Sequence, residues 1–427
     1  TGEKNVAVGT NALHSNTLGS PNTAVGYSAL YNNINGTANV SIGYYSLHQN
    51  TSGYHNVAVG NQASEKNTTA NSNTAIGFYA LKETQTHGGN TAVGKFALEN
   101  NAQINNTAVG FEAAQNTTSA VNIVAIGTLA LNSNTTGGQN NAFGYQALTT
   151  NTTGNGNTAV GHASLYSNTT GIQNTAVGLN SLDSNTTGQY NVGIGSHALG
   201  VNTEGSQNTA IGTFSLDANT TANNNTAVGY SSLGGNTTGH SNTALGYNTL
   251  QVNTTGVQNV AIGNQTLDSN TTGLNLTGVG FNVLAGNTTG NFNVGLGVNA
   301  LVANTGGSSN TALGSLALEN NTTSNNTAVG FKALQANTSA TGNAGVGYEA
   351  LLLNTTGSAN TSVGYQATRN NTTGTNNTAL GYAALNVNTT ASNNTAIGSS
   401  ALLSNTTGSN NVAVGQIALQ DNTTGAQ

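Results

Sequence analysis

The 427-residue sequence has no cysteine, methionine or tryptophan, a single proline, and only 4% charged residues. The absence of cysteine excludes a disulfide framework and a thiolate metal site. Six basic residues against 12 acidic ones give a net charge of −6. Nucleic acid binding needs a basic stripe, which six cations cannot form. No run of 18 apolar residues is present, so we expect no membrane insertion.

A 17-residue motif fills the sequence instead. The glycine of a segment such as N-T-A-V-G recurs 25 times between Gly9 and Gly415, at 22 intervals of 17 residues and two of 16. We number positions within each repeat from this glycine, which is position 0. Position −1 is always Val, Ile, Leu or Phe, and position +4 is Leu in 22 repeats. Because no linker interrupts the motif, we expect residues 1–427 to form a single continuous repeat array without a separate globular domain.

The composition of the repeat predicts strands and turns. Seventeen residues are too few for helix-pair repeats, which need about 33, and β-branched residues favour strands. We expect a strand near T-A-V-G, a bend, a second strand near Y-x-A-L, and a turn at N-T-T-G in which Gly or Asn takes positive φ. The fold class is therefore all-β, a repetitive parallel β-solenoid or β-roll of 25 rungs. At about 4.8 Å per rung it would form a rod roughly 120 Å long.

Two apolar columns, at positions −1 and +4, are predicted to form the core. Two large side chains per rung are a small core for ordering 17 residues, and backbone hydrogen bonds offset only part of the entropic cost. We expect self-association through an apolar column to supply further burial. The predicted core residues are Val25, Leu30, Val160, Leu165, Val177, Leu182, Ile211, Leu216, Val228, Leu233, Val414 and Leu419.

Glycine and asparagine form further columns. Glycine at position 0 permits a bend or the close approach of another backbone. Asparagine usually stands at positions −4 and +7, which predicts side-chain ladders between stacked rungs. The Asn, Thr and Gly turns are expected to face water. The predicted bend glycines are Gly26, Gly161, Gly178, Gly212, Gly229 and Gly415.

The motif resembles repeats of known fibrous proteins. The segment N-T-A-V-G-Y-x-A-L is similar to the A-x-G-x-x-A head repeats of trimeric autotransporter adhesins. The whole unit, as in residues 145–161, resembles the repeat arrays of tail-fibre-like proteins of phages, large viruses and bacteria. The resemblance covers essentially the whole chain. It implies a left-handed parallel β-roll in a homotrimer, assembled by a chaperone domain that is not in this sequence. The 17-residue unit is longer than the adhesin-head repeat, which implies a wider roll.

No catalytic or metal-binding pattern stands out. The 12 acidic residues and seven histidines are scattered over different repeats, whereas general acid–base catalysis needs groups held together. Four aspartates are too few for a calcium-binding β-roll. The G-x-G segments at Gly193 and Gly295 lack the third glycine of a dinucleotide-binding loop. We therefore expect no enzymatic activity and no cofactor.

Aromatic residues are frequent at position +1. Exposed rings can stack on a sugar or on a protein receptor. Alternatively, they pack against the residues above and below them or line an interface between chains. The candidate contact residues are Tyr27, Tyr145, Tyr230, Tyr247, Tyr348, Tyr365 and Tyr382.

The turn sequence Asn-Thr-Thr, or Asn-Thr-Ser, matches the acceptor triplet for N-glycosylation. The alternative is a repeated turn that happens to match this triplet. The candidate acceptors are Asn50, Asn67, Asn116, Asn134, Asn151, Asn168, Asn185, Asn219, Asn236, Asn253, Asn270, Asn287, Asn321, Asn337, Asn354, Asn371, Asn388, Asn405 and Asn422.

These observations predict a non-enzymatic, structural and adhesive fibre. We expect the repeat shaft of an extracellular appendage, either a bacterial surface filament or adhesin or a virion tail fibre. It would serve as a stiff spacer and attachment surface, with other copies as partners in a homotrimer or an end-to-end filament. A cell-surface glycan or protein would be its receptor. The alternatives are a carbohydrate-binding module that uses the aromatic column and an ice-binding or matrix protein.

Overall fold

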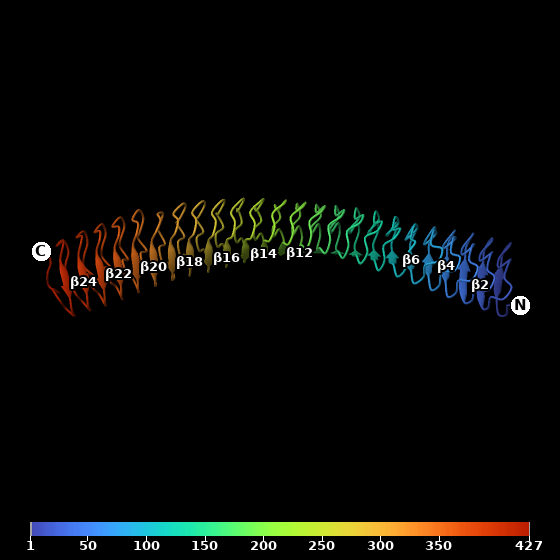
Figure 1. Cartoon of the computed structure of the whole chain (residues 1–427), viewed down its shortest axis with the longest axis horizontal. Coiled ribbons are helices and arrows are strands. Elements are labelled where there is room, and N and C mark those ends of the chain that lie inside the picture. Colours follow the sequence, from blue (N-terminus) through green and yellow to red (C-terminus); the bar gives the residue numbers. More distant parts are fainter. Residues whose placement is uncertain (1, 427) are drawn as a thin grey trace. The chain divides into compact units, whose positions relative to one another are not determined.

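The computed structural model describes residues 2–426, which are all-β and contain no helix. It divides into two compact units, Thr1–Phe214 and Ser215–Gln427. Each unit is a parallel β-solenoid with rungs of roughly 17 residues, so the predicted fold class is confirmed (Figure 1). That the two units form a single continuous array remains a prediction from the sequence.

Strands β1 to β13 belong to the first unit. They are β1 (Val6–Val8), β2 (Asn22–Val25), β3 (Asn39–Ile42), β4 (Val57–Val59), β5 (Thr74–Ile76), β6 (Thr91–Val93), β7 (Thr107–Val109), β8 (Val124–Ile126), β9 (Asn141–Phe143), β10 (Thr158–Val160), β11 (Thr175–Val177), β12 (Val192–Ile194) and β13 (Thr209–Ile211).

Strands β14 to β25 belong to the second unit. They are β14 (Thr226–Val228), β15 (Thr243–Leu245), β16 (Val260–Ile262), β17 (Thr277–Val279), β18 (Val294–Leu296), β19 (Thr311–Leu313), β20 (Thr327–Val329), β21 (Ala344–Val346), β22 (Thr361–Val363), β23 (Thr378–Leu380), β24 (Thr395–Ile397) and β25 (Val412–Val414).

Within each unit, every strand pairs in parallel with the strand of the next rung. The register is one whole repeat, so that Ala159 of β10 lies opposite Ala176 of β11 and Val160 lies opposite Val177. The same register joins β23 to β24 in the second unit. Residues at one position of the motif therefore form a column along each unit.

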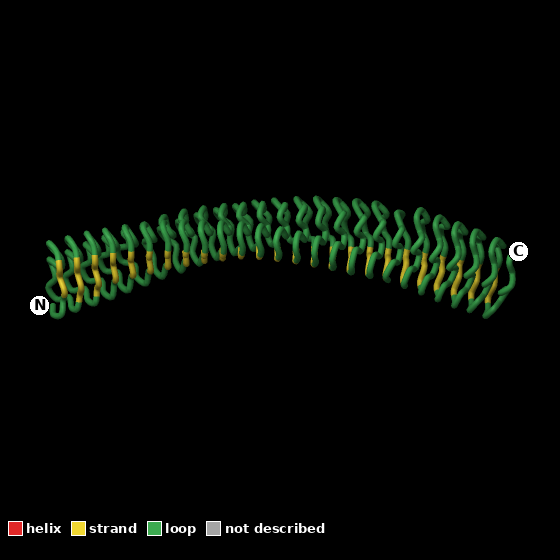
Figure 2. Tube along the Cα trace, turned by 180° about the vertical axis from the view of Figure 1, so that it is seen from behind, coloured by secondary structure: helices red, strands yellow, loops and turns green. Residues whose placement is uncertain are grey.

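Each rung has one strand, not the two that the sequence predicted (Figure 2). The segment after the glycine is a series of turns in which positions +2 and +4 have positive φ, as at Asn180 (51°) and Leu182 (52°). This alternation points successive peptide groups along the stack. The backbone N–H of Asn180 donates to the His162 carbonyl of the preceding rung (3.1 Å). The backbone N–H of Leu182 donates to the Ala198 carbonyl of the following rung (3.0 Å). The region keeps a hydrogen-bonded ladder without strand geometry.

The predicted location of positive φ was wrong. The turn glycine at position +10, such as Gly171, does not have positive φ. Left-handed residues occur instead at positions 0, +2, +4 and +12. The structure places all six predicted bend glycines in this group, and Gly178 is an example with φ of 133°. A Cβ atom on Gly178 would lie 2.6 Å from the carbonyl oxygen of Gly195, so the next rung also excludes a side chain there.

The core contains only one of the two predicted apolar columns. The leucines at position +4 are fully buried except in the first and last described rungs (Leu13 and Leu419), and the buried ones include Leu30, Leu165, Leu182, Leu216 and Leu233. Their companions are small residues at positions −2 and +3, which are mostly alanine. Alternation along the strand turns position −2 inward and therefore turns positions −3 and −1 outward. The assignment of position −1 to the core was wrong for Val25, Val160, Val177, Ile211, Val228 and Val414, which are half-buried or exposed.

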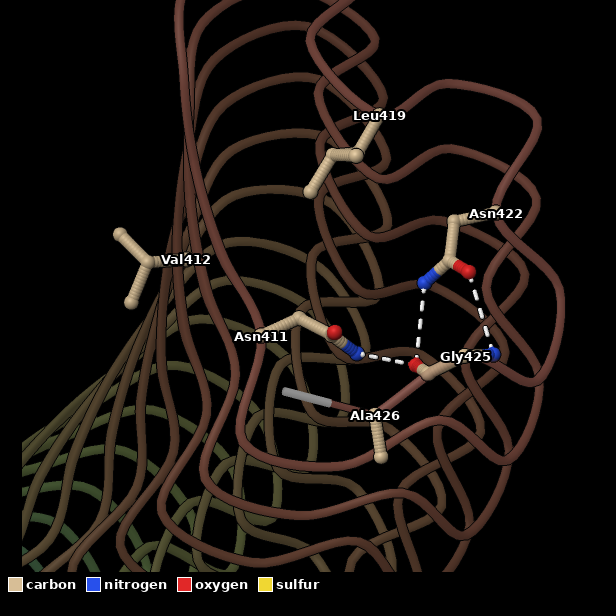
Figure 3. Close-up of a pocket in the computed structure, with 6 residues that line it drawn as sticks. All are labelled: Asn411, Val412, Leu419, Asn422, Gly425 and Ala426. Atoms are coloured by element: carbon tan, nitrogen blue, oxygen red, sulfur yellow. Dashed lines mark hydrogen bonds between the residues drawn. The ribbon is translucent and has the colours of Figure 1, made fainter.

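The last rung that the structure describes gives a view of the interior (Figure 3). Asn411, Leu419 and Asn422 surround a cavity of about 290 Å³, whereas the Val412 side chain points away from it. Leu419 is 51% exposed, unlike the other predicted core leucines, because no described rung covers it. The Nδ2 atoms of Asn411 and Asn422 both donate to the Gly425 carbonyl, at 2.8 and 3.2 Å. The cavity is the uncovered cross-section of the solenoid core.

Candidate functional site

The outward side chains of the strands form a regular surface, which we call the strand face. It consists of positions −3 and −1 of every rung. Position −3 is Thr in most rungs, and position −1 is always Val, Ile, Leu or Phe. All 18 charged residues of the sequence lie at other positions of the motif. The strand face is therefore uncharged along both units.

The aliphatic column of the strand face is partly accessible in every rung. The exposed fraction is 37% at Val160, 45% at Leu245 and 48% at Leu380. Large contiguous apolar surfaces are rare on soluble monomers and mark interaction sites. Strict alternation in T-A-V separates position −1 from Ala at −2 and Asn at −4, and the structure shows that the Ala and Asn side is the inner one.

The aromatic column at position +1 is exposed, but its rings cover one another. Tyr348 stacks on Tyr365 with ring centroids 5.1 Å apart, and Tyr365 stacks on Tyr382 at 5.4 Å. Tyr230 and Tyr247 stack in the same way at 5.6 Å. A sugar that binds an aromatic residue uses the face of the ring, and in these stacks the inner ring faces are occupied. The predicted packing between rungs is therefore present.

The remaining predicted aromatic contacts lie in the first unit. Tyr27 stacks on Tyr44 at 5.5 Å, and Tyr145 stacks on His162 at 5.2 Å. Tyr27 and Tyr145 are 44% and 47% exposed, and most of this exposed surface is the part of the side chain that the stacking does not cover. The structure therefore does not gather the seven predicted tyrosines into one site. It distributes them as short stacks along both units.

Asparagine ladders occupy the interior, as the repeated Asn positions predicted. At position +7, the Asn168 Nδ2 atom donates to Asn151 Oδ1 (2.8 Å) and to the Gly171 carbonyl (3.1 Å). At position −4, the Asn174 backbone amide donates to Asn157 Oδ1 (3.0 Å). Both columns are almost entirely buried. The expectation that the turn asparagines face water was wrong, because their amides close each rung from within.

In the two 16-residue repeats, the asparagine ladders accommodate the deletion of one residue. Both are shortened between positions +7 and −4. In each case the asparagine at −4 then donates directly to the one at +7: Asn106 to Asn101 at 2.8 Å, and Asn326 to Asn321 at 3.1 Å. The deletion therefore changes the turn without breaking the stack.

The predicted glycan acceptors are almost all in the +7 ladder. Seventeen of the nineteen have no exposed surface, and the exceptions are Asn116 and Asn422. Asn116 lies one position before the ladder and is exposed, since Thr117 occupies the buried place in that rung. Asn422 lies in the last described rung and is half-buried. The triplets are thus a structural turn whose asparagine points inward.

Charged groups form a few partly buried pairs. Arg369 Nε lies 2.7 Å from Glu349 Oε2, and this hydrogen bond holds the pKa of Glu349 below its usual value. Lys66 Nζ lies 2.6 Å from Glu83 Oε2, and this bond raises the pKa of Lys66. Burial raises the pKa of Asp268. These carboxylates lie in different rungs.

Among residues 2–426, no group of three or more His, Cys, Asp or Glu side chains is placed to hold a metal ion. The same residues include no helix with the length and apolarity that a bilayer crossing requires. The strand face is consequently the most extensive distinctive surface of the described chain.

Comparison with known proteins adds no family assignment. No protein-family model matches the chain, and no curated protein matches it as a relative.

Proposed function

We propose that this chain is a structural fibre component that associates with copies of itself through the strand face. The observation that carries the proposal is the half-exposed aliphatic column at position −1, which continues through every rung of both units. A second copy is the partner that fits this surface best, because only a stack with the same rung spacing keeps each side chain in an equivalent contact. The absence of charge on the face removes like-charge repulsion between copies.

The size of the strand face is consistent with such an interface. Three residues across and a rung spacing of about 4.8 Å give each rung about 50 Å² of face. The twelve strands of the second unit therefore offer roughly 600 Å². A standard specific interface buries about 800 Å² per partner. Each unit therefore offers most of the area of one standard interface.

The second part of the proposal is the biological role, which is supported by the resemblance of the motif to repeats of fibrous proteins. We propose the shaft of an extracellular appendage, on a bacterial surface or a virion, which acts as a spacer and attachment surface for a receptor. The resemblance to trimeric adhesin heads favours three copies. A carbohydrate-binding role would have to use ring edges and hydroxyls, because neighbouring rings cover one another within the tyrosine stacks.

Light scattering after size exclusion tests the proposed self-association directly. We expect a mass near three times 42.5 kDa for the wild type. A mass of 42.5 kDa at micromolar concentration would contradict the proposal.

A pair of variants in one rung tests whether the strand face is the surface through which the copies associate. Leu380→Lys places a charge on the face at a side chain that is 48% exposed, so the monomer should still fold. Thr390→Lys places the same charge in the exposed turn of the same rung. We expect Leu380→Lys to give a monomer with an unchanged circular dichroism spectrum. Thr390→Lys should keep the wild-type mass, and equal masses for both would place the interface elsewhere.

A further inference from the structure

The turn asparagines use both amide hydrogens inside the solenoid. The Asn185 Nδ2 atom donates to Asn168 Oδ1 at 2.9 Å and to the Gly188 carbonyl at 3.1 Å. Asn371 repeats the pattern in the second unit, with bonds to Asn354 Oδ1 at 2.7 Å and to the Gly374 carbonyl at 2.9 Å. Neither asparagine has any exposed surface. The nitrogen that would carry an N-linked sugar therefore faces the core.

N-glycosylation changes this nitrogen. The transferase forms a bond between Nδ2 and C1 of an oligosaccharide, breaks the C1–O bond to a lipid pyrophosphate donor, and releases one amide proton. The product has one N–H in place of two and a bulky, hydrated substituent. One ladder bond is lost, and the sugar cannot lie between rungs that are in backbone contact. A glycan at a ladder asparagine and a closed rung are sterically incompatible.

A second class of triplet has an accessible acceptor. It is Asn-Asn-Thr, in which the first asparagine stands at position −5, just before the buried asparagine at −4; this is position +12 of the preceding glycine in the 17-residue repeats. These first asparagines have positive φ and exposed side chains on the outside of the turn. They are Asn105, Asn224, Asn325, Asn376 and Asn393.

We infer that N-glycosylation of the Asn-Thr-Thr ladder and folding of this solenoid exclude each other. The chain must therefore fold where the N-glycan transferase does not modify it, or before it can. Where a host does add sugar to the folded chain, the Asn-Asn-Thr sites receive it. This inference is independent of self-association, because it depends only on the interior of each rung.

The test compares the full chain made in a bacterial cytosol with the full chain made in a eukaryotic secretory pathway. Glycan occupancy is measured at each asparagine by peptide mass spectrometry, and folding is measured by protease resistance. We expect cytosolic chain to be resistant. Resistant chain from the secretory pathway should carry sugar at sites such as Asn376 and Asn393 and none at ladder asparagines. Resistant chain with occupied ladder asparagines would overturn the inference.

A set of substitutions separates sugar from other causes of misfolding. Thr187 is exposed and is the third residue of the triplet at Asn185. Thr187→Ala therefore destroys the recognition triplet but leaves the ladder asparagine in place. The same change at the third residue of every ladder triplet gives a chain that should be resistant when made in the cytosol. We expect it also to regain resistance in the secretory pathway. If it is resistant from the cytosol but not from the secretory pathway, sugar at the ladder is not the cause and the inference fails.

Asn393→Gln is the control for the second class, because it removes an exposed acceptor at a position outside the strand face, where other rungs have glutamine with positive φ, as at Gln173. We expect this variant to lose one glycan in the secretory host and to keep the resistance of its parent. Loss of resistance through the missing sugar at Asn393 would contradict the division into two classes of site.

Discussion

The +7 column differs between the two units. In the second unit, asparagine occupies this column without interruption from Asn219 to Asn422, and each amide donates to the one before it. In the first unit, the column contains Thr84 and Thr117.

The amide chain in the first unit is broken at these threonines and also between Asn50 and Asn67, where Asn50 Oδ1 accepts no hydrogen bond. It runs from Asn16 to Asn50 and resumes between Asn134 and Asn202. The rungs between these runs still pair in parallel. Two of them keep a buried leucine at position +4, Leu81 and Leu98, and the other two have buried Ser64 or Ala114 in its place.

The difference teaches that the amide ladder is not required for a rung to form. The backbone ladder and the buried side chains at positions −2, +3 and +4 are sufficient, even where Ser64 or Ala114 replaces the leucine. In a repeat protein, stability is approximately a sum of local contributions from each rung and its neighbours. We therefore infer that the ladder sets how stable each region is, and that the rungs from Asn67 to Thr117 are the weakest part of the first unit.

The bend glycine should be equally necessary in both units, and its replacement should have the largest effect. Gly297→Ala introduces a Cβ at φ of 119° and within 2.9 Å of the Gly314 carbonyl oxygen. We expect local unfolding of that rung, with a loss above about 3 kcal/mol, since strain at φ alone costs about 1–3 kcal/mol. Hydrogen exchange resolved by peptide will locate the effect.

Gly306→Ala is the control in the same rung. Gly306 is exposed, has no positive φ, and a Cβ there would lie 3.5 Å from Thr289 Oγ1, which is ordinary contact. We expect its exchange pattern to match the wild type. Similar loss of protection in both variants would show that the bend conformation is not what the glycine column provides.

Transferring the defect of the first unit to the second should have an intermediate effect. Asn371→Thr removes the bonds to Asn354 and Gly374 and the bond accepted from Asn388. We expect a loss of about 1–3 kcal/mol, the cost of leaving buried polar groups unpaired. Faster hydrogen exchange in the neighbouring rungs would measure it, and unchanged exchange would mean that the ladder does not set local stability.

The reverse substitution should strengthen the first unit. Thr117 Oγ1 is buried and has no hydrogen-bond partner. Thr117→Asn restores the ladder residue, and we expect a gain of up to about 1 kcal/mol, the net value of a hydrogen bond. Slower exchange confined to this region would confirm the gain. A loss of protection there would contradict the proposed origin of the weak region.

Asp268 gives a smaller effect that depends on pH. Burial raises its pKa, so the folded chain disfavours the charged form. Stability is therefore greatest below the unfolded pKa and falls as the pH rises through the folded pKa. We expect Asp268→Asn to raise the melting temperature at pH 7 and to have no effect at pH 2. An effect of equal size at both pH values would indicate a cause other than the charge.

The smallest effect is expected at the pair of Glu349, which is buried, and Arg369, which is half-buried. The lowered pKa of Glu349 means that the pair contributes above the unfolded pKa and that its contribution is lost as pH falls through the folded value. Pairs with one partner open to solvent are worth about 0–1 kcal/mol, and the Arg369 side chain is 32% exposed. We expect Glu349→Gln to lower the melting temperature slightly at pH 7 in low salt, and 1 M salt to reduce the difference. A large effect that persists in salt would contradict this assignment.

The sequence by itself determined the rung, its period, the parallel stacking and the glycine at every bend. Each of these follows from local chemistry that is repeated 25 times: β-branched residues that favour strands, glycine at positive φ, and identical residues one period apart. The leucine column and the asparagine ladders could be predicted for the same reason.

Only the tertiary structure decided which side of the strand is the inside. Val177 and Leu182 look equivalent in the sequence, yet Leu182 is buried and Val177 lies on the strand face. Composition favours burial of both, but a strand must turn neighbouring residues to opposite sides. Ala and Asn occupy the inner side. The small alanines and the hydrogen-bonded asparagine amides let the rung close. The closed rung therefore holds one large apolar side chain and leaves the other on its surface.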